Sequence, residues 1–514
     1  MAINNYFLGL DYGTQSIRCG IVDTLGNFVA SGEVKYDTFY PQPGWAEQRP
    51  FDFVNSTDLV IEECYKKAGA EVFDRIRGIC VCSTTSTVIA VDEEDEPIGN
   101  AILWMDVRAV DQARRINKTK HDVLRHCGKE VSAEWILPKM MWIKENLPDV
   151  FEKAKLIVEL QDFANHYLTG RWCAALGQAA CKSCYVEELG GFQEEFFHEI
   201  GFDEFFDKAN LDVVSQTEPV GSLRSDLAGR FHLNPGIQVY QGGPDAYINV
   251  IGLGVCKTGD TGIVMGSSFV HLAIVDKPVF MEGIHGPYKN VLVPDYYCIE
   301  GGQISAASIT KWFINEFGIT DKNPYEIMAK EAANVPIGSD GLIVLDHFQG
   351  NRTPYKNPLS RGVFFGLTLA HTRAHIYRSI LEGVAYGTRN ILDTIENGVS
   401  VINEIRGCGG VVLNEFWMQI ISDVTAKPII LTQNSDKAGV LGCAVIAAVG
   451  YGAFGNISDV CDSMVKVTKI IEPSLEAHEQ YSKYYRNYLE IYERLEPMME
   501  SYQRRNGGGI EEYC

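Results

Sequence analysis

The chain has 514 residues, more than one hydrophobic core usually organises, so we expect two domains with a cleft between them. Apolar residues make up 46% and charged residues 22%, which is ordinary for a globular protein and excludes a disordered chain. The formal net charge of -22 excludes nucleic acids and anionic membranes as partners, because both require a positive surface.

The first elements predict an antiparallel meander. Residues 6–36 contain three β-prone runs, YFLGLDYG, SIRCGIVD and FVASGEVKY, which are separated by glycine-containing turns. The segment 56–69, STDLVIEECYKKAG, begins with capping hydroxyl residues and ends at a glycine, so it predicts a helix. A buried strand, IRGICVCSTT, is expected next. Strands and helices continue to alternate, which indicates an α/β fold.

A second glycine-punctuated β region, GDTGIVMGSSFVHLAIVD, lies at 259–276 and resembles the opening meander. Two such meanders predict a duplicated core, with one copy in each domain. We therefore expect domains over 1–252 and 253–505, followed by a flexible tail over 506–514.

Two helices are predicted late in the chain. EFWMQIISDV follows a glycine-rich turn, and HEQYSKYYRNYLEIYERL has an apolar face at helical spacing. Tyr481, Tyr484, Tyr488, Tyr492 and Leu495 form that face, which we expect to pack on the second domain.

The cysteines and the apolar segments indicate a cytoplasmic protein. The fourteen cysteines are scattered, and CVC and CKSC have no second pair to complete a zinc site, so we expect reduced thiols. The start MAINNYF lacks the features of a signal peptide. The longest apolar stretch, at 439–450, is too short to span a bilayer.

The opening hairpin is a candidate phosphate site. In a chain this acidic, an anionic ligand must be held by backbone N–H groups or a metal ion. Gly13 would let the backbone approach a ligand, Thr14 could donate to phosphate oxygens, and Asp11 could hold Mg²⁺ through water. Alone, such a turn is more often only a hairpin, but the similar MGSS turn at 265–268 would allow two domains to hold one polyphosphate.

Two further segments carry candidate chemistry. Asp245, in GGPDA, is placed to accept a proton from an attacking hydroxyl, although an aspartate there could equally cap the following helix. In the segment 407–429, the glycines at 409 and 410 could admit a flat base, and Asn414 could hydrogen-bond it. Ordinary strand-to-helix packing is the alternative interpretation of that segment.

Taken together, these motifs resemble the FGGY carbohydrate kinases, which belong to the actin and hexokinase-like ATP-binding superfamily. The segment GVFFGLTLAHTRAHIYRSILEG at 362–383 fits the second signature of the family, and GNRTPYKNP at 350–358 resembles its Gly-x-Arg-Thr-Pro loop. The similarity extends from residue 6 to about residue 450. It implies two ribonuclease-H-like domains, a central cleft, and transfer of phosphate from ATP to a sugar.

The resemblance also implies roles for individual residues. Asp245 would be the catalytic base and Asp11 would lie near the metal ion. The first phosphate loop would be formed by Gly13, Thr14 and Gln15, the second by Gly266, Ser267 and Ser268, and the adenosine site by Gly409, Gly410 and Asn414. Three positions depart from the family pattern: Ile136 in the first signature around 134–146, Ser267 where threonine is usual, and Lys437 where an acidic residue is common.

By the same resemblance, the sugar pocket would use Thr85, Ser86, Trp104, Asp106, Arg108 and Asp245. Xylulokinases carry Met-His and glycerol kinases carry Arg-Glu at the positions of Thr85 and Ser86, so small residues here favour a ribulokinase-like enzyme. Trp104 would face the sugar, with core packing as its alternative role. A ketopentose is the expected substrate. A polyol such as erythritol, ribitol, xylitol or glycerol is the first alternative, followed by a non-catalytic sugar sensor and an actin-like ATPase. Homodimers are common among similar kinases, but no residue here indicates one.

Overall fold

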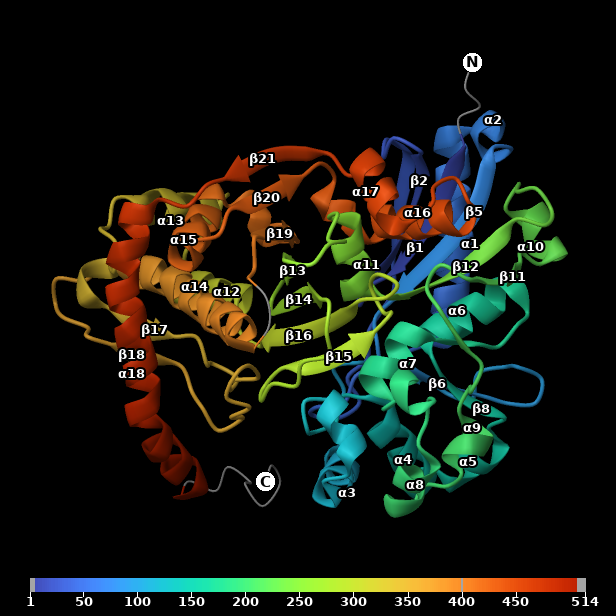
Figure 1. The fold of residues 1–514 in the computed structure, drawn as a ribbon, viewed down its shortest axis with the longest axis horizontal. Coiled ribbons are helices and arrows are strands. Elements are labelled where there is room, and N and C mark those ends of the chain that lie inside the picture. Colours follow the sequence, from blue (N-terminus) through green and yellow to red (C-terminus); the bar gives the residue numbers. More distant parts are fainter. Residues whose placement is uncertain (1–4, 399–400, 506–514) are drawn as a thin grey trace.

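The computed structural model describes residues 5–398 and 401–505, which form a mixed α/β structure built on two large sheets (Figure 1). The first sheet has the strand order β11-β12-β5-β1-β2-β3. Its strands are β1 (Tyr6–Tyr12), β2 (Ser16–Asp23), β3 (Phe28–Lys35), β5 (Ile76–Ser83), β11 (Pro219–Ser222) and β12 (Gln238–Pro244). The predicted meander and the strand that follows it are therefore confirmed.

The second sheet has the order β15-β16-β14-β13-β19-β20-β21. Its strands are β13 (Asp260–Met265), β14 (Phe269–Val275), β15 (His285–Lys289), β16 (Tyr297–Gln303), β19 (Glu404–Cys408), β20 (Ile429–Thr432) and β21 (Val467–Ile471). As predicted, β13 and β14 pair in antiparallel fashion through the 259–276 region.

The two sheets share one pattern of strand pairing. In each, three neighbouring strands are antiparallel, β1-β2-β3 and β13-β14-β16, and the first of them pairs in parallel with a later strand, β5 or β19. That later strand pairs in parallel with β12 or β20, which in turn pairs with an antiparallel edge strand, β11 or β21. The connections differ at the edges, because β11 precedes β12 in the chain and β15 adds a further strand beside β16. The topology confirms the expected duplicated core.

Helices α11 (Asp245–Gly252) and α16 (Ala438–Gly450) pack together between the two sheets (Figure 1). Their backbones touch, because a Cβ atom at Gly442 would lie 2.0 Å from the carbonyl oxygen of Ile248. Although α16 is distant in sequence from the first sheet, it also contacts β1, β2 and β5. This helix pair therefore joins the two halves of the protein.

Other helices cover the outer faces. The predicted helix at 56–69 is present but begins earlier, as α1 (Pro50–Ala68), so the expected capping role of Ser56 and Thr57 is wrong. Pro50, which needs no N–H partner, opens the helix, while both hydroxyl residues are buried inside it. The predicted helix after the glycine turn is α15 (Glu415–Thr425).

The C-terminal helix α18 (Leu475–Arg505) packs on the second half, as predicted. Tyr481, Tyr488 and Tyr492 are buried in its core, and Tyr484 and Leu495 are partly buried against it. Also within the second half are α12 (Ala307–Glu316), α13 (Pro324–Ala333), α14 (Arg373–Gly398), α17 (Ile457–Met464), β17 (Ile343–Leu345) and β18 (Val363–Phe365).

A smaller sheet of order β4-β7-β6-β8 and several short helices complete the first half. The strands are β4 (Glu47–Gln48), β6 (Val88–Val91), β7 (Ala101–Ile102) and β8 (Leu156–Glu159), with the pair β9 (Ala174–Ala175) and β10 (Val213–Val214) nearby. The helices are α2 (Ala70–Phe73), α3 (Val110–Thr119), α4 (Ile136–Asn146), α5 (Pro148–Lys153), α6 (Leu160–Thr169), α7 (Leu176–Lys182), α8 (Glu194–Glu199), α9 (Phe205–Lys208) and α10 (Ser225–Arg230).

Across residues 5–398 and 401–505, no helix is long and apolar enough to cross a bilayer. Each cysteine in these ranges is a buried free thiol. The tail predicted over 506–514 lies outside the described residues.

Candidate active site

The candidate first phosphate loop connects β1 to β2. The Gly13 N–H donates to the carbonyl oxygen of Ser16 at 3.0 Å, and the Tyr36 hydroxyl donates to the Gly13 carbonyl. The carbonyl of Thr14 accepts from Nε2 of Gln48 at 2.7 Å. These bonds fix the turn, while the side chain of Gln15 remains exposed.

The candidate second phosphate loop, between β13 and β14, has a related turn. The Gly266 N–H donates to the Ser268 carbonyl at 3.0 Å, and the Ser267 carbonyl accepts from the N–H groups of Ala306 and Ser308. Gly266 and Ser267 are exposed, so they are accessible to a ligand.

The candidate adenosine segment lies beside this second loop. Gly409 has a φ of +98°, and a Cβ atom there would stand 2.3 Å from the carbonyl oxygen of Met265. Only glycine fits this position. Gly410 is exposed next to it. The Asn414 side chain caps α15 by accepting from the Trp417 N–H at 3.1 Å, so its carbonyl oxygen is already occupied.

Asp11, near the end of β1, and Asp245, directly after β12, are electrostatically coupled carboxylates, and β5 lies between these two strands in the sheet. Burial raises the pKa of Asp11, opposed by the positive charge of Arg18, whose Nη1 lies 4.0 Å from Oδ2. Burial, reinforced by the negative charge of Asp11, raises the pKa of Asp245 to about 7. A carboxylate that titrates near neutrality has the properties required of a general base.

Asp245 does not lie on a loop, because β12 leads directly into α11 and Asp245 is the first residue of that helix. Its Oδ1 accepts from the N–H of Ala246 at 2.7 Å. The alternative that Asp245 caps the helix is not observed, because Pro244 holds the N-cap position without a side-chain cap bond. Asp245 remains partly exposed, which is compatible with a role as base.

The candidate sugar residues at 85 and 86 differ in exposure. Thr85 is partly exposed, whereas Ser86 is buried, has a φ of +60°, and accepts through its Oγ from the Ile136 N–H at 3.1 Å. A direct contact of the Ser86 hydroxyl with a sugar is therefore disfavoured, because that oxygen already supports α4.

Trp104, a candidate sugar-contacting residue, is bonded to the candidate first phosphate loop, because its Nε1–H donates to Oγ1 of Thr14 at 3.0 Å. Asp106 and Arg108 are instead paired with each other. Arg108 Nε donates to Asp106 Oδ1 at 2.9 Å, and Asp106 Oδ2 accepts from the Ala46 N–H at 2.7 Å.

Our expectation that Asp106 and Arg108 hydrogen-bond the sugar directly is at odds with this geometry. Their side chains are 0% and 2% exposed, and Arg108 also binds Glu47 at 2.8 Å. The guanidinium lies 3.8 Å from the Trp45 ring centroid. The hydrogen-bonding groups of these two buried side chains are instead directed to protein partners.

An ion pair between Lys182, which acts on Asp245, and Glu300 was not anticipated from the sequence. Lys182 of α7 lies 4.0 Å from Oε1 of Glu300 on β16, and both are partly exposed. Burial disfavours both charges, but their attraction outweighs it, so the pKa of Lys182 is raised and that of Glu300 lowered. The Tyr247 hydroxyl holds Glu300 at 3.0 Å, and Lys182 also lowers the pKa of Asp245.

The Gly-x-Arg-Thr-Pro segment connects the second half to the first. Arg352 Nη2 donates to Oε2 of Glu134 at 3.1 Å, and Lys356 donates to the carbonyl of Gly128. The segments at 350–358 and 134–146, singled out separately in the sequence, therefore meet in the structure.

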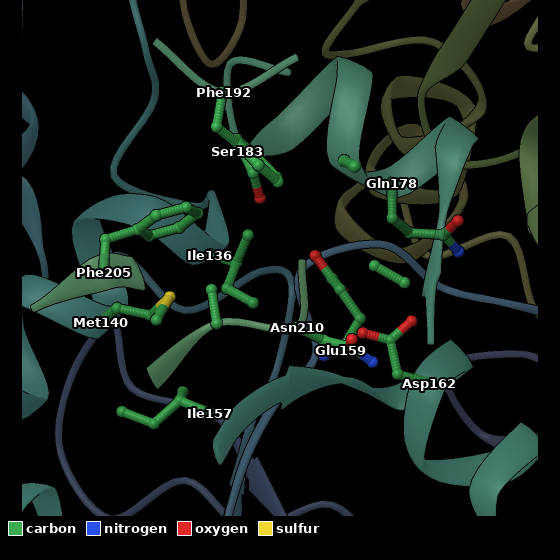
Figure 2. A pocket seen from close by; sticks show the side chains of 13 residues that line it. Ile136, Met140, Ile157, Glu159, Asp162, Gln178, Ser183, Phe192, Phe205 and Asn210 are labelled. Carbon is green, nitrogen blue, oxygen red and sulfur yellow. Dashed lines mark hydrogen bonds between the residues drawn. The ribbon is translucent and has the colours of Figure 1, made fainter. Parts of the chain in front are cut away.

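A small cavity in the first half, drawn in Figure 2, is too small for a sugar. It has a volume of about 30 Å³ and is lined by buried Glu159, Asp162 and Gln178. That volume holds one or two water molecules.

Comparison with known proteins identifies the family of this chain. Residues 6–252 match the N-terminal domain of the FGGY family of carbohydrate kinases, and residues 262–451 match its C-terminal domain. The chain belongs to the FGGY family of carbohydrate kinases. Members are phosphotransferases that act on a sugar hydroxyl, and ATP is implied as the phosphate donor.

Two relatives of this FGGY kinase match it over nearly their whole length. A human FGGY carbohydrate kinase domain-containing protein is 29% identical over 95% of this chain and 96% of its own. A ribulokinase from Geobacillus thermodenitrificans is also 29% identical, over 95% and 94%. The crystal structure of a xyloylose kinase from Brucella ovis shares the fold, with a TM-score of 0.88 and 24% identity over 96% of this chain and 100% of that one.

The three residues that depart from the FGGY pattern lie in different environments. Ile136 opens α4 and is buried, and Ser267 is exposed in the second phosphate loop. Lys437 donates to Oγ of Ser31 at 3.1 Å and lies 5.2 Å from the Phe28 ring centroid. At position 437 the basic residue thus contacts the first half.

Proposed function

We propose that this FGGY kinase phosphorylates a ketopentose of the ribulose or xylulose type, with Asp245 as the general base. The observation that carries the proposal is the Asp245 carboxylate at the end of β12, with a pKa raised to about 7 and with Lys182 and Asp11 close enough to influence it. A base must be partly ionised at neutral pH to accept the proton of a sugar hydroxyl.

The ATP phosphates would lie between the two related turns. Gly13, Thr14 and Gln15 would face them from the first half, and Gly266, Ser267 and Ser268 from the second. Phosphoryl transfer depends mainly on positioning and on charge stabilisation, so two rigid turns that present backbone N–H and hydroxyl groups suit the reaction. Gly409 and Gly410 lie beside the second turn, where adenosine would extend from the phosphates.

Asp11 fits a magnesium ion that is bound mostly by phosphate and water. The described residues contain no group of three or more acidic, histidine or cysteine side chains arranged for a metal. One buried carboxylate is nevertheless sufficient for Mg²⁺, which keeps several waters and binds phosphate oxygens. Asp11 would hold such an ion, which would neutralise charge on the phosphates when bound.

The sugar would contact side chains from both halves. Thr85 and Trp104 would border it in the first half, and Lys182 and Glu300 offer a donor and an acceptor beside Asp245. A ketopentose presents a carbonyl oxygen, which can accept from lysine, and several hydroxyl groups, which can donate to a carboxylate. The name of the Geobacillus relative, ribulokinase, agrees with this substrate class.

The proposal is tested by measuring the ADP formed from ATP, in the presence of Mg²⁺, with a panel of sugars. The panel would contain D- and L-ketopentoses, pentitols, erythritol, glycerol, gluconate and ketohexoses, with Asp245→Asn as the matched inactive control. Strong stimulation by one pentulose supports the proposal, and stimulation by a polyol alone moves the substrate to the alternative class. If ATP binds but no sugar stimulates its turnover, the result favours the alternative that the protein is a sugar sensor.

A further inference from the structure

Two buried ionisable residues, Lys139 and Glu159, hold the loop at 84–87 in place. The Ser86 N–H donates to Oε2 of Glu159 at 2.6 Å, and the Ser86 carbonyl accepts from Nζ of Lys139 at 2.9 Å. With the Ser86 hydroxyl bound to the Ile136 N–H, every polar group of Ser86 has a protein partner. The loop conformation is therefore determined by residues that face away from the proposed sugar.

Lys139 also reaches a second loop of the site. Its Nζ donates to the carbonyl of Leu103 at 2.6 Å, and Leu103 precedes Trp104, which binds Thr14. One ammonium group thus joins the loop that carries Thr85 to the loop that carries Trp104. Lys139 lies in α4, within the first-signature segment whose role the sequence left unexplained.

Glu159 is anchored on the opposite side of Ser86. It ends β8 and caps α6 through a reciprocal capping box with Asp162. Figure 2 shows its carboxylate near Asp162, with Gln178 on the same side of the cavity. Oε1 of Glu159 has no protein partner, so only Oε2 contacts the loop.

Burial argues against a chemical role for either residue. Lys139 is 0% exposed and Glu159 is 4% exposed, so neither can touch a sugar or a phosphate. Burying ionisable groups is costly unless they are hydrogen-bonded, so the bonds that Lys139 and Glu159 make to Ser86 favour their buried positions. A strained residue with positive φ, such as Ser86, persists where its surroundings fix it.

We propose that Lys139 and Glu159 are positioning residues. They fix the position of the 84–87 loop relative to the loop that carries Trp104, and this geometry determines which sugar is selected. The assignment of these loops to the sugar rests on the proposed function. ATP binding should depend much less on the pair, because Lys139 reaches the proposed first phosphate loop only indirectly, through the Trp104 side chain that donates to Thr14.

Lys139→Met removes both donated hydrogen bonds while keeping an unbranched side chain. We expect the KM for the best sugar to rise at least tenfold, the KM for ATP to stay within twofold, and discrimination between epimeric sugars to fall. Hydrogen exchange in peptides covering 84–87 should become at least tenfold faster. Glu159→Ala should give the same pattern, whereas Glu159→Gln, which keeps an oxygen acceptor for Ser86, should resemble the wild type.

Lys427→Met is the matched control, since Lys427 also donates to a backbone carbonyl, that of Ile402 at 2.8 Å, but lies in the second half. The proposal would be overturned if Lys139→Met kept the wild-type rate of hydrogen exchange at 84–87 and the wild-type KM for the sugar. Equal rises in the KM for the sugar and the KM for ATP would also overturn it. If Lys139→Met does not fold, an unchanged Glu159→Ala variant, or a tenfold defect in Glu159→Gln, overturns it instead. If no sugar stimulates the wild type, the proposed function fails, while the exchange measurement still decides whether the pair holds the loop.

Discussion

A Cβ atom at Gly439 would stand 2.7 Å from Oδ2 of Asp11, so the first turn of α16 lies directly against the carboxylate near the end of β1. Cβ atoms essentially never approach a neighbour this closely, and one of the two groups would have to move. The position of Asp11 therefore depends on a glycine more than 400 residues away in the sequence.

Gly439→Ala should displace Asp11 and lower kcat by about tenfold or more, because a shift of about 1 Å in a positioned group costs rate steeply. ADP release with the best sugar measures the effect. Gly229→Ala is the control, since Gly229 lies in α10 with open space around its Cβ direction and should leave kcat unchanged. Equal kcat values for the two variants would contradict the role given to Asp11.

Asp245→Asn should lower kcat by about 10² or more, because the base is lost. It should also stabilise the protein at pH 8. The pKa of Asp245 is raised from 3.8 to about 7, so folding disfavours its charge above pH 7. Removing that charge should add roughly 1–3 kcal/mol to the free energy of unfolding.

Denaturant unfolding at pH 8 checks this second effect. Asp462→Asn is the control, because Asp462 is 68% exposed and pairs only with a surface lysine, Lys257, at 3.5 Å. An Asp245→Asn variant that is inactive and no more stable than Asp462→Asn would show that burial of the carboxylate is not costly.

The pH dependence of sugar kcat/KM should report the same group. The base acts in its ionised form, so activity should fall about tenfold per pH unit below the raised pKa of about 7. The contribution of Asp245 to stability changes with pH in the opposite direction. The folded state binds the Asp245 proton more tightly than the unfolded state, so this contribution is present below pH 3.8 and is lost as the pH rises to about 7. A rate profile that is flat down to pH 5 would exclude Asp245 as the titrating base.

Gly409→Ala should weaken ATP binding. The substitution forces an L-residue to a φ of +98° and places Cβ 2.3 Å from the Met265 carbonyl, beside the second phosphate loop. We expect the KM for ATP to rise about tenfold, which corresponds to about 1.4 kcal/mol. Gly341→Ala is the control for backbone strain alone, because Gly341 has a φ of +91° but open space where a Cβ atom would lie. A change in sugar KM alone would argue against the adenosine assignment.

Local patterns were sufficient to predict much of the fold. Alternating apolar residues and glycine turns located β1, β2, β13 and β14, and the similarity of the two turns predicted the duplication. The start of α1 was missed because hydroxyl residues at 56 and 57 resemble a cap, although Pro50 offered a competing start signal.

Residue identity does not reveal how side chains pair. Asp106 and Arg108 suit sugar hydroxyls by type, but two residues of opposite charge at this spacing satisfy each other once they are buried. Lys182 and Glu300 come from α7 and β16, and their approach depends on how the two sheets are arranged. No spacing rule within the sequence could bring that pair together.

The packing of α16 onto β1, β2 and β5 has a consequence for synthesis of the chain on the ribosome. Val440 lies against Gly9 and Gly20, and Ala447 lies near Gly78, so the helix covers one face of the first sheet. Until residues 438–450 have left the exit tunnel, the nascent first half carries an uncovered apolar face. We expect this half to remain a client of chaperones through most of translation and to complete its core only when residues 438–450 emerge.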